Sequence, residues 1–105
     1  MAADVVLVLT TLGASADADA FARTLVEERL AACVNVLPLM SSTYRWKGAI
    51  ERDDERQLVI KTTRARVAAL QARVRELHPY ETPEFLVLPV AGGSDTYLGW
   101  VEEST

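Results

Sequence analysis

Cysteine and histidine are almost absent from this chain of 105 residues, which contains one of each. With Cys33 alone, no disulfide can form within the chain, and a single cysteine fits a reducing compartment. The chain is long enough to bury a hydrophobic core that needs neither disulfides nor metal. One cysteine and one histidine also exclude a zinc site with the usual Cys/His spacing.

Long apolar runs are missing too. No window approaches the roughly 18 apolar residues that a membrane span requires. The first residues, Met1 to Asp4, lack the basic segment and the apolar run of a secretory signal. We therefore expect residues 1–105 to form one cytoplasmic domain without a membrane partner.

An excess of positive charge is also lacking, because 11 basic residues face 15 acidic ones and the net charge is −4. Nucleic-acid binding draws most of its non-specific affinity from clustered positive charge, so this class of function is disfavoured. The arginines at positions 64, 66, 73 and 75 have helical spacing beside an apolar stripe, which indicates a solvated helix face.

The apolar pattern predicts strands that alternate with helices. Strands are expected at 5–9, 33–37, 43–46, 49–60 and 85–88, and the strand from 49 is expected to be exposed in its first half. The first helix ends near Leu30 and is capped by Ser15 or Asp17, whereas Thr62 or Thr63 caps the second, which ends near Leu77. Lys47-Gly48 predicts a tight turn. Asp95 is expected to cap a short closing helix.

The resulting order, β-α-β-β-α-β with a short C-terminal helix, is typical of an α+β ferredoxin-like sandwich. Two helices would cover one face of the sheet, and the third strand would lie between the first and the second. This architecture supports many unrelated activities, so function has to be argued from particular residues.

The segment from His78 to Glu84 is the first candidate site, because it combines the only histidine with two prolines, Tyr80 and the carboxylates of Glu81 and Glu84. The prolines restrict the backbone and would hold the polar groups in defined directions. The alternative is that the prolines only end a helix and that Tyr80 closes the rim of the core.

Five strings then have to be considered together: Ala31-Ala32-Cys33-Val34-Asn35, Tyr44-Arg45-Trp46-Lys47-Gly48, Ile60-Lys61-Thr62-Thr63, the segment from His78 to Glu84, and Tyr97-Leu98-Gly99-Trp100. In this order and spacing the chain closely resembles the CutA family of divalent-cation tolerance proteins, over roughly residues 5–100. The resemblance implies a homotrimer with a PII-like arrangement of ferredoxin-like subunits. It also implies a protein that is not an enzyme and that functions in tolerance of divalent cations.

The resemblance implies copper binding only in part. Copper-binding members are expected to carry a cysteine near the end of the first strand and two consecutive histidines before the proline, where this chain has Leu9 and the pair Leu77-His78. One imidazole without a soft partner is a poor copper site. A site for copper or another divalent cation would therefore combine His78 with Glu81, Glu84 or another subunit.

Two further functions stay open. A PII-like sensor would bind a small anionic effector between subunits, with Lys61, Tyr80, Glu84 and Trp46 as the lining, because Lys61 precedes the start of a helix. Alternatively, Lys61 forms a salt bridge with Glu84 across the interface, and the trimer is a structural anchor for another protein. The aromatic residues 44, 46, 97 and 100 are interpreted mainly as trimer packing, and the alternative is a stacking platform for a planar ligand in the cleft between subunits. Cys33 is expected to be a small buried hydrophobe, and the acidic arm 51–55 a solvated strand face.

Overall fold

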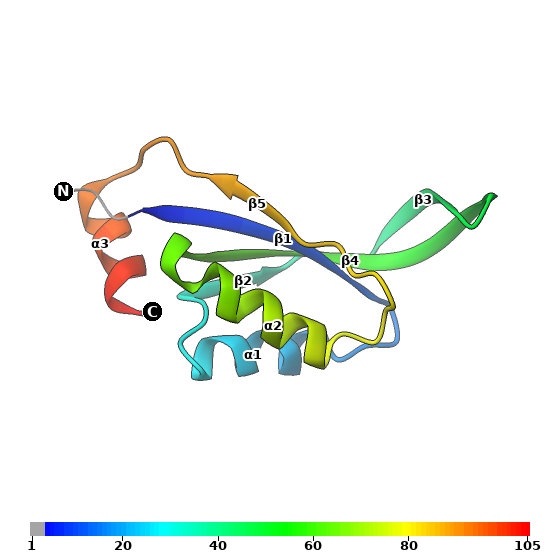
Figure 1. Ribbon diagram of the computed structural model, residues 1–105, viewed down its shortest axis with the longest axis horizontal. Helices are drawn as coiled ribbons and strands as arrows, with labels where there is room; N and C mark the ends of the chain where they lie inside the picture. The colour runs from blue at the N-terminus through cyan, green and yellow to red at the C-terminus, as the bar shows by residue number, and fades with distance from the viewer. Residues whose placement is uncertain (1–3) are drawn as a thin grey trace.

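The computed structural model describes residues 4–105 and contains one five-stranded sheet with helices on one face and at one end (Figure 1). The elements are β1 (Val5–Gly13), α1 (Ala18–Glu27), β2 (Cys33–Val36), β3 (Met40–Trp46), β4 (Ala49–Thr63), the 3₁₀ helix η1 (Arg64–Arg66), α2 (Val67–Leu77), β5 (Leu86–Pro89) and α3 (Asp95–Glu103). None of the helices in residues 4–105 is both long and apolar enough to cross a membrane.

The strand order is β2-β4-β1-β5, and β3 pairs with the first half of β4. Every paired strand is antiparallel. The strand predicted from residue 49, which is the third strand of the β-α-β-β-α-β order, is β4, and it lies between β1 and β2. This position confirms the predicted ferredoxin-like arrangement.

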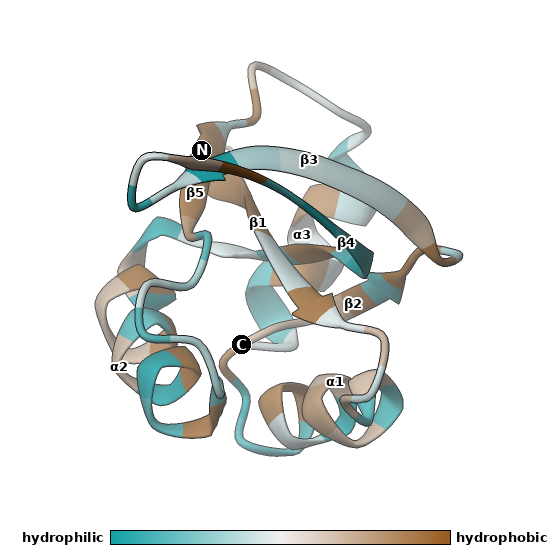
Figure 2. Cartoon of the chain, turned by 90° about the vertical axis from the view of Figure 1, so that its right-hand side faces the viewer, coloured by the Kyte–Doolittle hydropathy of each residue, from teal (hydrophilic) through white to brown (hydrophobic). Residues whose placement is uncertain are grey.

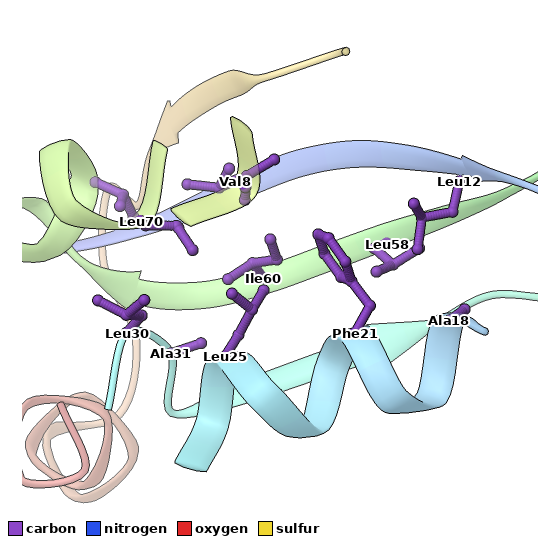
Figure 3. Packing of buried hydrophobic residues seen from close by; sticks show 12 residues of the cluster. Val8, Leu12, Ala18, Phe21, Leu25, Leu30, Ala31, Leu58, Ile60 and Leu70 are labelled. Atoms are coloured by element: carbon purple, nitrogen blue, oxygen red, sulfur yellow. The ribbon is translucent and has the colours of Figure 1, made fainter. Parts of the chain in front are cut away.

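Helices α1 and α2 lie side by side on one face of the sheet (Figure 2). Alternate residues of the two central strands point toward them, for example Val8 of β1 and its register partner Ile60 of β4, which are both fully buried. Phe21 and Leu25 of α1 and Leu70 of α2 complete this core (Figure 3). The apolar residues at every second position of the strands and the apolar stripe of each helix thus pack together in one core layer.

The opposite face of the sheet, which we call the open face, is covered by a helix only at one end. There α3 packs Leu98 and Val101 against Val5 of β1. Because side chains alternate along a strand, the register places further apolar residues on the open face: Leu7, Leu9, Val59, Leu86 and Leu88. Leu86 and Leu88 of the edge strand β5 are exposed.

β3 and the first half of β4 form a hairpin arm that extends beyond the sheet (Figure 1). The chain consequently measures 47 × 26 × 24 Å along its principal axes. At the tip, Lys47 and Gly48 have φ values of 48° and 82°, the left-handed conformation that tight hairpin turns require. The predicted turn at this position is confirmed.

Several predicted helix ends differ from the structure. The carboxylate of Asp17 caps α1 as predicted, by accepting a hydrogen bond from Ala20 N, but the helix ends at Glu27 rather than near Leu30. Neither predicted threonine caps α2, because η1 precedes that helix, and the hydroxyl of Thr62 instead donates to the carbonyl of Leu30.

The closing helix also starts differently, since Ser94 rather than Asp95 caps α3 through a hydrogen bond from Tyr97 N. The strand ends differ as well. β1 continues to Gly13 rather than Leu9, β3 begins at Met40 rather than Thr43, and β4 continues to Thr63 rather than Ile60. β2 ends one residue earlier than predicted, and β5 is shifted by one residue to Leu86–Pro89.

Candidate functional site

His78 begins the connection from α2 to β5. The helix ends at Leu77 because His78 adopts an extended conformation and Pro79 has no N–H with which to continue the helix. The imidazole is only 7% exposed and packs edge-on against the ring of Phe21. His78 is thus held at the junction between the helix layer and the end of β1.

Both ring nitrogens of His78 are engaged. Nδ1 accepts a hydrogen bond from the backbone N–H of Tyr80 at 3.1 Å, so the ring proton lies on Nε2, which donates to the carbonyl of Thr11 at 2.6 Å. No nitrogen lone pair is left for a metal in this arrangement. A metal at His78 requires one of these two hydrogen bonds to be displaced.

The two carboxylates predicted as further metal ligands, those of Glu81 and Glu84, contact other residues instead of His78. Glu81 is exposed and its Oε2 lies 4.0 Å from Lys47 Nζ, and Glu84 accepts a hydrogen bond from Gln57 Nε2 at 2.8 Å. Across residues 4–105, no three His, Cys, Asp or Glu side chains are placed to hold a metal ion. The donors do not fit copper within one subunit, so a metal site at His78, Glu81 and Glu84 stays a prediction that needs a second subunit.

A groove of about 750 Å³ lies between the hairpin arm and the loop that follows His78. We call it the arm groove. Its wall combines aromatic, carboxylate and small polar residues of β1, β3, β4 and the loop: Thr11, Met40, Ser42, Tyr44, Trp46, Asp53, Glu55, Gln57, Pro79, Tyr80, Glu81, Thr82, Pro83 and Glu84. By the strand register, its β3 and β4 residues belong to the open face.

Two tyrosine hydroxyls donate to carboxylates in this groove. Tyr80 donates to Glu55 at 2.9 Å, and Tyr44 donates to Asp53. Burial and the hydrogen bond to Glu55 raise the pKa of Tyr80 to about 12. The hydrogen bond to Asp53, followed by partial desolvation and nearby negative charge, raises the pKa of Tyr44 to about 12. Both shifts indicate an environment that resists further negative charge.

Glu55 differs from the other carboxylates of the groove because it is only 7% exposed. Its one hydrogen bond comes from Tyr80, and no ion pair connects it to a basic residue within the described part of the chain. The prediction that the acidic arm is a solvated strand face is therefore wrong at Glu55. Two sequence features could have indicated that Glu55 is buried. They are the alternation of side chains between the two faces of β4 and the presence of Tyr80 in the opposing loop.

The residues predicted to line an effector site are only partly brought together. Trp46, Tyr80 and Glu84 all line the arm groove. Lys61 lies on the open face too, but it is six residues, about 20 Å, along β4 from Glu55. Its Nζ lies 5.7 Å from the ring centroid of Tyr97. A joint site that includes Lys61 stays a prediction that needs a neighbouring subunit.

Cys33, for which a buried structural role was predicted, lies in β2 opposite Lys61. It is partly exposed rather than fully buried. Sequence reasoning also missed Asp53 and Gln57 as groove residues, because their neighbours in the loop are distant in sequence.

Comparison with known proteins gives consistent results. A sequence model described as CutA1 divalent ion tolerance protein matches residues 6–104. The Protein CutA of Mus musculus is 51% identical over 84 residues, which cover 80% of this chain and 48% of that protein. The chain is also similar to the solved divalent cation tolerance protein of Thermus thermophilus, with 46% identity, a TM-score of 0.92 and coverage of 96% and 98% of the two chains.

The solved CutA1 of Oryza sativa is 36% identical, with a TM-score of 0.94 and coverage of 99% of this chain and 95% of that one. The match to the family model and the identity to these relatives extend over most of the described fold, from β1 into α3. This chain therefore belongs to the CutA1 divalent ion tolerance protein family.

Proposed function

We propose that the protein acts in divalent-cation tolerance as a non-enzymatic, PII-like homotrimer in the cytoplasm. Membership of the CutA1 family supports the tolerance role. The observation that carries the proposed assembly is the open face, an apolar surface that one subunit leaves partly uncovered. Its leucines at positions 7, 9, 86 and 88 lie on two neighbouring strands. An apolar face of this kind on a cytoplasmic protein marks an interaction surface.

The edge strand supports the same assembly. All four residues of β5 are exposed, three of them are apolar, and its outer edge has no strand partner within residues 4–105. Such edges pair with other chains unless they are covered. A second copy of this chain satisfies both the edge of β5 and the apolar part of the open face beside it, and the protruding arm can reach across a neighbour.

Two refinements of the proposal differ in what the trimer binds. A divalent cation, copper included, would need donors from two subunits, since His78, Glu81 and Glu84 do not converge in one. An anionic effector would face four carboxylates in the arm groove and would depend on Lys61 of a neighbouring copy. The charge of the groove favours the cation.

Growth under metal stress tests the proposed role. In cells that lack their own protein of this family, expression of the wild-type chain should increase the copper concentration that permits growth. A variant with lysine in place of both Leu86 and Leu88 should fold but fail to assemble, and it should not restore tolerance. Equal growth with and without the wild-type chain contradicts the role, and full rescue by the double variant contradicts the need for assembly.

A further inference from the structure

We propose that the arm groove binds an organic cation with an ammonium or guanidinium head group. The head group would lie among the carboxylates and against the aromatic rings of the hairpin arm. The inference does not depend on the proposed role in metal tolerance. It rests on the composition of one groove, on a buried carboxylate and on the position of one lysine.

The charge of the groove is the first argument. Four of its fourteen lining residues carry carboxylates, and none of the fourteen is lysine, arginine or histidine. Glu55 is the most informative of the four, because it is buried and has no cationic partner in the described chain. A desolvated carboxylate is strongly stabilised by a cation that reaches it.

The aromatic residues are the second argument. Trp46, Tyr44 and Tyr80 line the same groove as these carboxylates. Aromatic faces attract ammonium and guanidinium groups, and tryptophan does so most strongly. Rings and carboxylates together provide both the apolar contact and the charge that an organic cation requires.

Lys47 shows this chemistry at the rim of the groove. Its Nζ lies 5.5 Å from the ring centroid of Trp46 and 4.0 Å from Glu81 Oε2. The side chain of Lys47 is 72% exposed and does not belong to the lining of the groove. The chain's own ammonium group thus contacts one ring and one carboxylate of the wall.

An inorganic cation fits the groove less well. Mg²⁺ and Ca²⁺ require six or more oxygen ligands gathered around one point, and the described His, Cys, Asp and Glu side chains form no group that could hold a metal. Asp53 and Glu55 already accept hydrogen bonds from tyrosines. A volume of about 750 Å³ is instead within the range of small-molecule sites.

Titration calorimetry with agmatine and choline tests the proposal on the full-length protein at constant ionic strength. We expect saturable binding of at least one probe to the wild type. Glu55→Gln and Trp46→Leu should each weaken it at least about fivefold. Glutamine keeps an oxygen that can accept the hydrogen bond from Tyr80, so Glu55→Gln should preserve the fold, and thermal melting checks this.

Two control variants make the same kinds of substitution at residues that do not line the groove. Asp54→Asn removes the same charge from the adjacent residue of β4, and Trp100→Leu removes the other tryptophan, which lies in α3. Both should bind the probes as the wild type does. Equal weakening in Asp54→Asn would mean that general charge attraction is responsible, which overturns the site.

Three other results also overturn it. The first is the absence of binding of either probe to the wild type. The second is magnesium chloride binding with the same dependence on Glu55. The third is weaker self-association of Glu55→Gln with unchanged binding of the probes, which would assign the cation at Glu55 to a lysine or arginine of a neighbouring copy.

Discussion

Replacing Leu86 and Leu88 together by alanine should dissociate the proposed trimer. The register pairs these residues with Leu9 and Leu7, which places all four side chains on the open face. In one subunit they are 53% and 40% exposed, so about half of each side chain is available to be buried by a neighbour.

The size of the effect follows from that exposure. Full burial of a leucine contributes about 1.5–3 kcal/mol. Burial of the remaining half contributes about 1 kcal/mol for each residue, or about 2 kcal/mol per subunit. Three subunits then lose about 6 kcal/mol of assembly free energy, which corresponds to about four orders of magnitude in the dissociation constant of the trimer.

Sedimentation velocity across a dilution series measures this change. The matched control is Val87→Ala in the same strand, because Val87 pairs with Val8 and faces the helix layer. The control should lower subunit stability without changing assembly. An unchanged association of the double variant, or an equal loss in Val87→Ala, would refute the assignment of the open face to the interface.

Three further predictions concern the site and the fold. His78→Ala leaves the carbonyl of Thr11 and the N–H of Tyr80 without partners, so urea denaturation should show a loss of about 2–3 kcal/mol; a loss under about 0.5 kcal/mol would show that the imidazole is not structural. The pKa of Tyr80, about 12, lies above the ordinary value near 10, so its contribution to stability is complete below about pH 10 and is lost as the pH rises through about 12. The ultraviolet absorbance of tyrosinate should therefore appear at lower pH in Glu55→Gln, and an identical titration would disprove the coupling. Asp17→Ala removes the cap of α1 and should cost about 1 kcal/mol in thermal denaturation, whereas no change would mean that solvent replaces the cap.

The sheet and its order could be predicted from the sequence because the patterns were strong there. Val5 to Leu9 is a continuous apolar run, and Lys47-Gly48 is a turn signal between two strands. Helix starts were less predictable, since a threonine before a helix can cap it or bond elsewhere. Thr62 bonds to the carbonyl of Leu30, a tertiary contact that no local pattern shows.

The candidate site could be predicted only in part. Tyr80 and Glu84 were identified because the loop concentrates polar residues between prolines, and Trp46 because a large aromatic residue on a hairpin needs a partner. Glu55 was missed because its burial depends on Tyr80, which is 25 residues away. Lys61 lies six residues along β4 from Glu55, and the sequence could not show that the groove forms around Glu55 rather than around Lys61.

The mass of the wild-type protein in dilute solution tests the central claim most directly, because the open face and the edge of β5 have a function only if another copy covers them. Native mass spectrometry or sedimentation equilibrium should give about three times the chain mass of 11.5 kDa, unchanged on dilution. A stable species of 11.5 kDa would contradict the account.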